Sequence, residues 1–469
     1  MNPGASGRPL LGRTRRVHWW HRRRGRFWVG PPQLTVLAFA ALILLGTGLL
    51  SLPFAVEADE RAPFMTALFT AASAASVTGL VVEDTSSYWS LSGEVTILLL
   101  IQVGGFGVMA LATVLALVTG RRLGLRMTVY TGSEAKGVSL GEVRQLVLGV
   151  LYVTLLFEGA LSAVLTLRWW LTYDLPFTEA LYTGTFHAIS AFNNAGFSLY
   201  TDSLMGFAAD PWITIPIAVA VIAGGLGFPV WVELWRFTRR RGESRHWSLH
   251  AKITVVMTAV LLVVGFAAFL ALEWNNPATM GGMSLRERLL TGFFQAVMPR
   301  TAGFNSLDFG AMNTQTLLVT DILMFIGGGS AGTAGGIKVT TFAILLLVVY
   351  ANVRGEPTVH VAGRRLSHAT VAQATTVTTL AMGAVLAATL TLMVITPFTL
   401  DRILFETVSA FATVGLSTGI TADLPPLGQA VLVFLMFIGR IGPITLASAL
   451  ALRRRGRAYE LPEARPIVG

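Results

Sequence analysis

Four short stretches of this chain end in the same kind of glycine, and they recur along its length. The stretches read SVTG, NNAG, RTAG and ATVG, and their last residues are Gly79, Gly196, Gly303 and Gly415. These glycines follow one another at intervals of 117, 107 and 112 residues. A regular spacing of this kind indicates a repeated structural unit, and it limits the possible architectures more than any single residue does.

Each unit has the same layout: an apolar span, a shorter segment that leads into the glycine, and a second apolar span. The shorter segments cover residues 63–76, 178–193, 286–299 and 402–413. They are too short to cross a bilayer, which takes about 20 apolar residues. Irregular backbone at membrane depth is tolerated only where it is enclosed by protein or lines water. The layout therefore predicts a half-helix and a glycine turn inside a membrane domain.

The composition supports a membrane protein. The chain has 469 residues, of which 53% are hydrophobic and 13% are charged, whereas a soluble domain has about 25% charged residues. Cysteine is absent, which excludes disulfides and thiolate metal sites. Eight stretches are long enough to cross a bilayer, namely 32–56, 95–120, 146–167, 211–232, 253–272, 322–353, 369–400 and 424–452.

The chain has a net charge of +10, and its basic and acidic residues gather at opposite ends of these spans. Basic clusters precede the first span and follow the second, fourth, sixth and eighth, for example Arg13–Arg26 and Arg453–Arg455. The positive-inside rule then predicts that both termini are cytoplasmic, and a nucleic-acid-binding role is disfavoured. The basic arm before the first span lacks a clear cleavage site and is not a signal peptide. The opposite side carries acidic residues that predict a negative outer mouth: Glu57, Asp59, Glu60, Glu83, Asp84, Asp202, Asp210, Asp308 and Asp423.

The half-helices and glycines together predict a filter for cations. A helix carries partial negative charge at its C-terminal end, so four ends aimed at one axis attract a cation, and Glu179 and Glu406 suit the opposite, positive ends. Glycine permits backbone angles that a Cβ would block, and converging main-chain oxygens can replace the hydration shell of an ion. The predicted ion-binding residues are Val77, Thr78, Gly79, Asn194, Ala195, Gly196, Thr301, Ala302, Gly303, Thr413, Val414 and Gly415.

From residue 32 onward, these features resemble the Trk/Ktr/HKT superfamily of potassium transporters, and the absence of two extra N-terminal helices resembles its Ktr-type membrane subunit. The resemblance implies an all-α integral membrane protein with four helix–pore-helix–helix units in pseudo-fourfold arrangement around one central pore, with eight transmembrane helices. Glycine at residue 79 argues for potassium, because plant relatives with serine at this position favour sodium. The expected divisions are an N-terminal arm (1–31), pore units 32–122, 123–242, 243–356 and 357–456, and a tail (457–469).

The sixth span contains six glycines in ten residues and must break there, since each glycine costs about 1 kcal/mol relative to alanine in a helix. Gly327, Gly329 and Gly332 match a dinucleotide-binding pattern, but no βαβ unit surrounds them. Close packing of helices through small residues is an alternative. The resemblance implies a gating loop over 327–336 that blocks the pore and moves on opening. The predicted gate residues are Gly327, Gly328, Gly329, Ser330, Gly332, Thr333, Gly335, Gly336, Lys338 and Arg440.

Arg440 lies within the eighth span, where a charge is costly and usually functional. The resemblance implies a positive charge beneath the filter that slows cations. An ion pair with Glu158 of the third span is the structural alternative. Lys338 either anchors the loop or extends toward the interface, and His187 is expected to be packed rather than functional.

Two other classes of protein fit the sequence less well. A secondary transporter of another fold would show inverted repeats, whereas these units all run in one direction. An intramembrane enzyme would need a cluster of acid–base or ligand residues, which the spans do not offer, so no enzyme and no cofactor is expected. The resemblance implies potassium uptake across a bacterial inner membrane, with possible sodium dependence, a homodimer, and a cytoplasmic nucleotide-binding partner that senses ATP and ADP. A sodium-permeable or proton-coupled transporter of the same superfamily remains the alternative.

Overall fold

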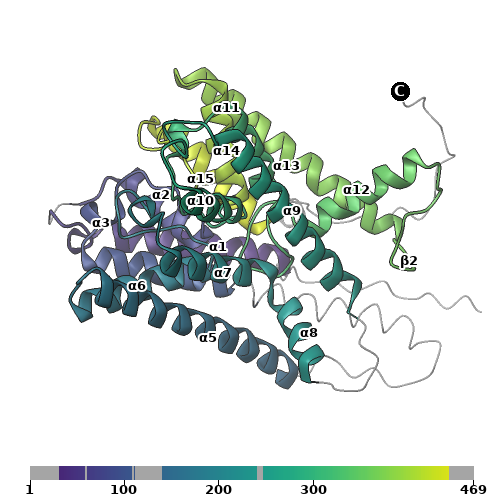
Figure 1. Ribbon diagram of the computed structural model, residues 1–469, viewed down its shortest axis with the longest axis horizontal. Coiled ribbons are helices and arrows are strands. Elements are labelled where there is room, and N and C mark those ends of the chain that lie inside the picture. The colour runs from purple at the N-terminus through teal and green to yellow at the C-terminus, as the bar shows by residue number, and fades with distance from the viewer. Residues whose placement is uncertain (1–30, 59–60, 108–109, 111–139, 240–246, 443–469) are drawn as a thin grey trace, which may run out of the picture.

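The computed structural model describes residues 31–58, 61–107, 110, 140–239 and 247–442. Its elements follow the four expected units in chain order (Figure 1). The first unit contains α1 (Pro31–Leu50), η1 (Pro53–Ala55), α2 (Phe64–Ser76), α3 (Thr85–Tyr88) and a helix over Leu91–Gly107. The second contains α5 (Leu140–Thr172), α6 (Phe177–Phe192), η2 (Met205–Phe207), α7 (Pro211–Leu226) and α8 (Phe228–Arg239).

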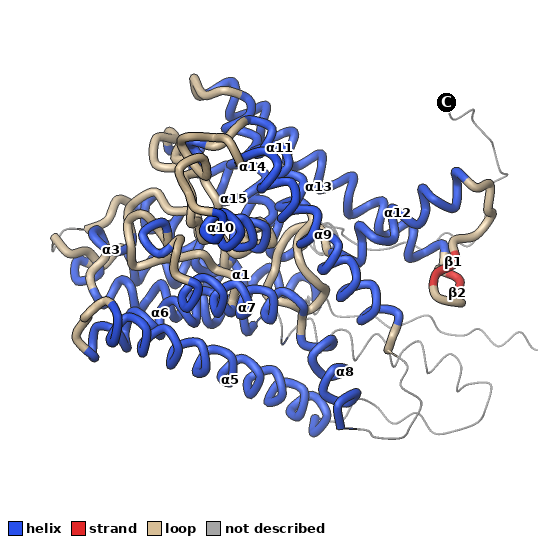
Figure 2. Tube along the Cα trace, viewed as in Figure 1, coloured by secondary structure: helices blue, strands red, loops and turns tan. Residues whose placement is uncertain are grey.

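The third unit contains α9 (Leu249–Glu273), α10 (Leu285–Val297), η3 (Phe309–Ala311), α11 (Thr314–Phe325) and α12 (Val339–Val353). The fourth contains α13 (His368–Ile395), α14 (Leu400–Ala412) and α15 (Pro426–Ile441). Figure 2 shows that helices make up most of the described chain and that loops and turns link them. The expected all-α class misses one small feature, an antiparallel hairpin of β1 (His360–Val361) and β2 (Arg364–Arg365) beyond α12.

The first helix of each unit forms the outside of the bundle. Within the described residues, the helices long and apolar enough to cross a membrane unbroken are Gln33–Leu50, Val147–Thr172, Leu249–Glu273 and His368–Ile395, and the bent pair α7–α8 would make a fifth span. These helices expose large apolar side chains, such as Leu44 at 64%, Val263 at 67% and Leu390 at 64%. Such faces are stable against lipid but not against water.

The half-helices α2, α6, α10 and α14 lie inside this shell. Each begins and ends within two residues of the predicted bounds. Small residues let neighbouring helices approach closely in a membrane, and in α2 nearly every residue after Met65 is buried. The prediction for Glu179 is confirmed, because it lies in the first turn of α6. The prediction for Glu406 is wrong: it lies in the middle of α14, whose acidic first-turn residue is Asp401.

Each half-helix packs against its own unit and against the unit that precedes it. The half-helix α10 contacts α7, and α14 contacts α11. The half-helix α2 contacts α15, which brings the fourth unit against the first. Between the first and second units, the side-chain amide of Asn193 (Nδ2) donates a 3.0 Å hydrogen bond to Gln102 Oε1. The chain therefore closes on itself, and the ends of the four half-helices meet in its interior.

Two of the predicted spans are interrupted. The span over 211–232 is not one straight helix, because α7 and α8 meet at an angle of 97°. The bend falls at Gly227, whose φ is +89° and whose added Cβ would lie 2.7 Å from Ser330 O. Residues of the sixth span thus fill the corner. The sixth span itself breaks between α11 and α12, as its glycine content predicts.

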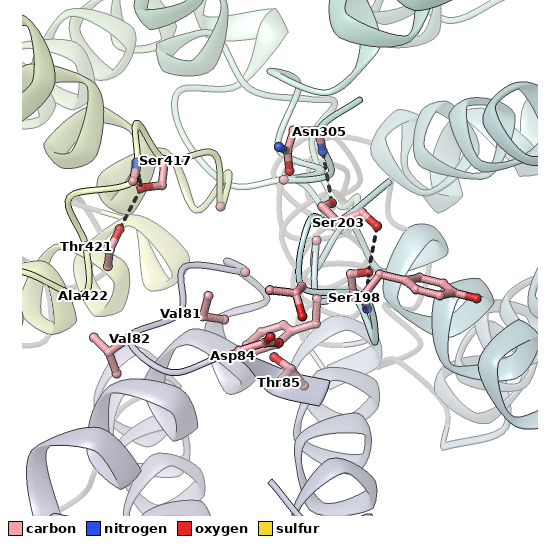
Figure 3. Close-up of a pocket in the computed structure, with 18 of the residues that line it drawn as sticks. Val81, Val82, Asp84, Thr85, Ser198, Ser203, Asn305, Ser417, Thr421 and Ala422 are labelled. Atoms are coloured by element: carbon pink, nitrogen blue, oxygen red, sulfur yellow. Dashed lines mark hydrogen bonds between the residues drawn. The ribbon is translucent and has the colours of Figure 1, made fainter. Parts of the chain in front are cut away.

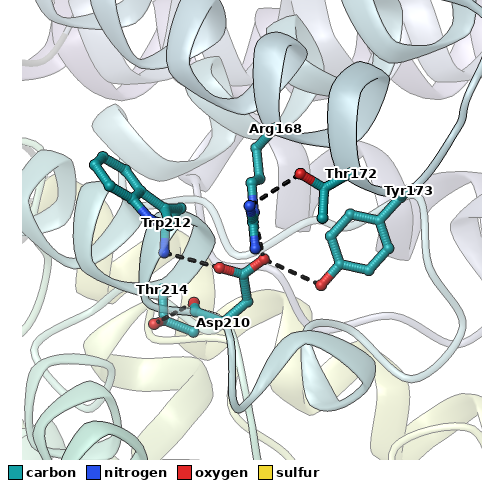
Figure 4. Close-up of polar contacts among 6 residues, drawn as sticks. All are labelled: Arg168, Thr172, Tyr173, Asp210, Trp212 and Thr214. Carbon is teal, nitrogen blue, oxygen red and sulfur yellow. Dashed lines mark hydrogen bonds and ion pairs between the residues drawn. The ribbon is translucent and has the colours of Figure 1, made fainter.

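Asp210 fixes the start of α7, and Figure 4 shows its contacts. One carboxylate oxygen accepts from the Trp212 amide at 2.9 Å. The other accepts from Arg168 Nε at 2.8 Å and from the Tyr173 hydroxyl at 3.1 Å. Asp210 was predicted in the outer mouth, but its carboxylate is occupied as a helix cap and an interhelical ion pair.

Replacing Asp210 by alanine is expected to destabilise the protein by about 2 kcal/mol, because it removes an N-cap and leaves Arg168 and Tyr173 without their acceptor. The melting temperature of the purified protein in detergent measures this. Asp210→Asn keeps a capping oxygen and should lose less. Equal melting temperatures for wild type and Asp210→Ala would contradict this role.

Candidate functional site: filter strands and gating loop

The four half-helices end in the same backbone turn. The residue two positions before each glycine is in the left-handed region, with φ of 56° at Val77, 62° at Asn194, 70° at Thr301 and 50° at Thr413. The glycines have φ of 94°, 69°, 75° and 94° in chain order. A left-handed conformation costs a residue with a Cβ about 1–2 kcal/mol. The same costly turn occurs in all four units, although the second and third triplets differ most from the others in sequence.

The four glycines approach one another in a ring. A Cβ added to Gly79 would lie 2.2 Å from Ala195 O, and one added to Gly196 would lie 2.7 Å from Ala302 O. A Cβ on Gly303 would lie 2.5 Å from Val414 O, and one on Gly415 would lie 2.1 Å from Thr78 O. Each glycine thus faces the main-chain oxygen that precedes the glycine of the next unit, and the fourth closes on the first.

Serine side chains hold three of these turns in place. The Gly79 amide donates to Ser73 Oγ and the Gly415 amide to Ser409 Oγ, each at 3.1 Å. Ser190 Oγ donates to Phe197 O at 2.8 Å. All three serines lie six residues before their glycine, and the third unit has Val297 there. Two of these bonds use a glycine amide and the third uses the carbonyl of Phe197, which follows Gly196, so none of them occupies a carbonyl of the triplets.

The segment after the glycine is braced in two units by the residue nine positions before it. Glu406 accepts from the Ser417 hydroxyl at 2.5 Å, from the Thr418 amide at 3.0 Å and from the Thr421 hydroxyl at 2.9 Å. In the second unit, His187 Nε2 lies 3.0 Å from Ser198 Oγ and Nδ1 lies 2.8 Å from Thr183 O. His187 is fully buried, as expected of a packed residue, and it also holds Ser198, which follows the second triplet.

All four glycines line one cavity of about 360 Å³, shown in Figure 3. Of the predicted acidic mouth, Glu83, Asp84 and Asp308 line it. Burial raises the pKa of Asp84, but hydrogen bonds from Thr201 and Ser86 outweigh this and hold it below its usual range. The carboxylate therefore stays charged at neutral pH. Glu57, Asp202, Asp210 and Asp423 do not line this cavity, and Asp59 and Glu60 lie outside the described residues.

The glycine-rich segment between α11 and α12 is a loop held by main-chain hydrogen bonds. Its two ends pair with each other, since the Gly327 amide donates to Ile337 O at 2.9 Å. Its middle pairs with the end of α7: the Gly329 amide donates to Gly225 O at 2.8 Å and the Thr333 amide to Gly224 O at 3.2 Å. The alternative of glycines that pack two continuous helices does not describe this loop.

The loop lies directly against the first residues of two predicted filter strands. Thr333 Oγ1 donates to Asn194 Oδ1 at 2.8 Å. A Cβ added to Gly335 would lie 2.0 Å from Thr413 Oγ1 and 2.6 Å from Ala412 O. The predicted gate residues Thr333 and Gly335 are therefore brought together with the predicted filter residues Asn194 and Thr413.

Arg440, in the last turn of α15, also holds the loop. Its guanidinium donates to Thr333 O through Nη1, and to Gly104 O through Nη2 at 3.1 Å. The alternative ion pair with Glu158 is wrong. Glu158 accepts instead from the side-chain amides of Gln102 (Nε2, 3.2 Å) and Asn193 (Nδ2, 2.9 Å). Main-chain oxygens, and not a carboxylate, therefore balance the buried positive charge of Arg440.

Lys338 anchors the loop at its C-terminal end. Its ammonium donates to Ala334 O, four residues earlier. Its side chain is partly buried and does not extend toward an interface. The remaining predicted gate residues, Gly327, Gly328, Ser330, Gly332 and Gly336, all lie in the loop.

A second glycine pattern was not recognised in the sequence. An added Cβ would lie 2.0 Å from Ala75 O at Gly104, 2.0 Å from Phe192 O at Gly224, and 1.7 Å from Phe411 O at Gly439. In three units the second span thus touches the end of its own half-helix through a glycine. The next residue is Gly105, Gly225 and Arg440 in these units. Alignment of the units on this glycine could have marked Arg440 as the exception.

Several buried charges were also missed, because each lies in an apolar context without a motif. Arg300 is 6% exposed and donates only long hydrogen bonds, to Thr258 O at 3.5 Å and Thr258 Oγ1 at 3.4 Å. Asp321 is 6% exposed, and its Oδ1 has no partner among the described residues. Glu273 is fully buried and accepts from Thr279 Oγ1 at 2.6 Å. The described residues contain no cluster of acidic or histidine side chains that could hold a metal ion.

The geometry can be compared with known proteins. The family model described as "TrkH: Cation transport protein" matches residues 28–455. The chain belongs to this family. As a family member it is a transporter and not an enzyme, and it is a multi-pass protein of the bacterial inner membrane. The recognition of the superfamily from the filter glycines is thereby confirmed.

Individual relatives of this TrkH-family transporter match over nearly their whole length. "Ktr system potassium uptake protein B" of Bacillus subtilis is 38% identical, over 90% of this chain and 93% of that protein. "Potassium/sodium uptake protein NtpJ" of Enterococcus hirae is 34% identical, over 96% of this chain and 99% of that protein. The crystal structure of the potassium transporter TrkH from Vibrio parahaemolyticus superposes with a TM-score of 0.72 at 20% identity, covering 92% of this chain and 87% of that one, which shows that the fold is shared.

Proposed function

We propose that this transporter carries potassium into the cell through a pore lined by main-chain oxygens from its four units. The observation that carries the proposal is the ring of contacts in which Gly79, Gly196, Gly303 and Gly415 each face the carbonyl that precedes the next glycine. Carbonyls brought to one axis can replace the hydration shell of a monovalent cation. Two relatives named above are potassium uptake proteins, which favours potassium as the cargo.

The half-helices would also attract cations over a longer range. Each of α2, α6, α10 and α14 ends at a filter strand, so its partially negative C-terminal end points toward the proposed ion path. The outer cavity with Glu83, Asp84 and Asp308 would raise the local concentration of cations. Together these features favour cations over anions, while the carbonyl ring would favour a dehydrated ion over a hydrated one.

The proposed architecture places four units, 32–122, 123–242, 243–356 and 357–456, in pseudo-fourfold arrangement around the pore. The packing of each half-helix on the preceding unit supports it. Eight spans and two cytoplasmic termini complete the proposal. Residues 1–30 of the basic arm (1–31), most of the predicted basic clusters and the tail (457–469) lie outside the described residues. The proposed orientation is therefore supported by the distribution of charge in the sequence alone.

The loop over 327–336 is proposed to close the pore from the cytoplasmic side. Its contacts with Asn194 and Thr413, and the hold of Arg440 on Thr333 O, support a closed conformation. Opening would require the loop to leave the filter. Arg440 and Lys338 would both stabilise the closed loop, and the charge of Arg440 would also oppose the passage of cations.

Regulation by a separate cytoplasmic subunit is part of the proposal. Three relatives, two from Bacillus subtilis and one from Vibrio alginolyticus, carry names of a "Ktr system", in keeping with a membrane subunit that acts with a nucleotide-binding partner sensitive to ATP and ADP. A homodimer and activation by sodium are proposed on the same resemblance. The name of the Enterococcus relative, a potassium/sodium uptake protein, favours a sodium-permeable transporter as the second candidate, and a proton-coupled transporter remains the third.

Flux into liposomes tests the function. We expect liposomes that contain the purified chain to take up radioactive rubidium, and external potassium to suppress this uptake at a lower concentration than sodium does. Empty liposomes are the control. Equal suppression by the two ions would favour the sodium-permeable alternative, and uptake that requires an imposed proton gradient would favour the proton-coupled one. Absence of protein-dependent rubidium or potassium flux would contradict the proposal.

A further inference from the structure

The innermost residues of the four filter strands are not equivalent. These residues, each two positions before a glycine, are Val77, Asn194, Thr301 and Thr413. All are at most 1% exposed. Three carry a side-chain oxygen, while Val77 offers only methyl groups. A dehydrated monovalent cation seeks oxygen ligands such as carbonyls and hydroxyls, so three of the four strand ends could supply one from a side chain.

Two of these three oxygens have no partner among the described residues. Thr301 Oγ1 and Thr413 Oγ1 are both buried, and neither forms a hydrogen bond with a described residue. A buried hydroxyl without a partner is unfavourable, and an ion or a water that binds there is one explanation for its presence. Thr413 Oγ1 faces the gating loop, because an added Cβ on Gly335 would lie 2.0 Å from it.

The third oxygen is occupied by the loop itself. Asn194 Oδ1 accepts the hydroxyl proton of Thr333 at 2.8 Å. Thr333 is fixed in this position, since its amide donates to Gly224 O at 3.2 Å and its carbonyl accepts from Arg440. An oxygen that accepts a hydroxyl proton along one direction cannot present the same lone pair to a cation there.

We propose that Asn194 Oδ1, Thr301 Oγ1 and Thr413 Oγ1 form an inner site for a dehydrated monovalent cation, and that Thr333 competes with the cation for Asn194. The proposal rests on the pore proposed above and adds a coupling to it. A cation at this site would favour the displaced loop, and the closed loop would weaken cation binding by the same factor, because linkage between two binding events is reciprocal.

Binding of rubidium to the purified full-length chain, followed by calorimetry, tests the site. Thr333→Val keeps the shape of the side chain and removes its donor, so we expect the apparent Kd to fall about five-fold, at the lower end of common coupling factors. Thr413→Val should raise the Kd, whereas Thr413→Ser should restore it. Thr320→Val is the matched control, since this buried hydroxyl bonds only to Thr316 O within its own helix, and it should leave the Kd unchanged.

A second background separates competition for Asn194 from a general loosening of the loop. In Asn194→Ala protein, Thr333→Val should no longer change the Kd, because no oxygen remains to be released. An equal fall in both backgrounds would overturn the competition, as would a Kd that Thr333→Val leaves unchanged in otherwise wild-type protein. Wild-type protein that binds no rubidium would instead contradict the proposed pore, so the two failures are distinguishable.

Discussion

Replacing Gly79 by serine is expected to lower potassium uptake about ten-fold and to weaken the preference for potassium over sodium. Gly79 has φ of +94°, and an added Cβ would lie 2.2 Å from Ala195 O. This oxygen belongs to the main chain and cannot swing aside as a flexible side chain can, so the Ala195 carbonyl itself must shift. A side chain in a left-handed conformation costs about 1–2 kcal/mol, and 1.4 kcal/mol in a transition state corresponds to ten-fold in rate.

Liposome flux of potassium and of sodium, measured on the same preparations, checks this expectation. Gly48→Ser is the matched control, because Gly48 lies in α1 with nothing within 4 Å of an added Cβ. It should transport as wild type does. If Gly79→Ser protein with wild-type melting behaviour keeps both its rate and its ion preference, Ala195 O and its equivalents do not bind the ion.

Shortening the loop between Gly329 and Gly335 is expected to raise cation flux about ten-fold or more. The deletion removes Thr333 and its hydrogen bond to Asn194, together with the carbonyl that Arg440 holds. A closed state favoured by about 1.4 kcal/mol or more would then lose that advantage, and each 1.4 kcal/mol is ten-fold in the open population. Flux should also become less dependent on any regulatory subunit.

The initial rate of potassium flux into liposomes, without a partner, measures the effect. Arg440→Ala is the companion substitution and should raise flux in the same direction, because it releases Thr333 O and removes a positive charge from the path. Arg354→Ala is its control, since Arg354 lies at the end of α12 against the Tyr350 ring. Unchanged or lower flux in a correctly folded shortened protein would show that the loop does not close the pore.

The sequence predicts the repeated part of this structure well. The half-helices, the filter glycines and the broken sixth span follow from local composition, because an apolar segment of half the membrane thickness and a run of glycines have few stable solutions in lipid. The conformation at Asn194 and Thr301 matches that at Val77 and Thr413 despite the different residues. Backbone geometry is repeated more faithfully than the side chains that adopt it.

The contacts between units could not be predicted in the same way. The ion pair of Arg440 with Glu158 was a reasonable alternative, but the sequence does not say that Glu158 is already occupied by the amides of Gln102 and Asn193. The bend at Gly227 depends on the position of Ser330, which lies in another unit. Such features depend on which segments meet in three dimensions, and hydrophobic pattern and propensity carry no information about that.

The four strands of the proposed filter belong to one polypeptide, and this affects how the protein can change during evolution. In a channel built from four identical chains, every substitution is copied four times, so a new side chain alters the whole circumference at once. Here a mutation changes one strand only, as the single valine beside three residues with side-chain oxygens already illustrates. Ion preference can therefore change one strand at a time, and natural variants should span a graded series of selectivities rather than two extremes.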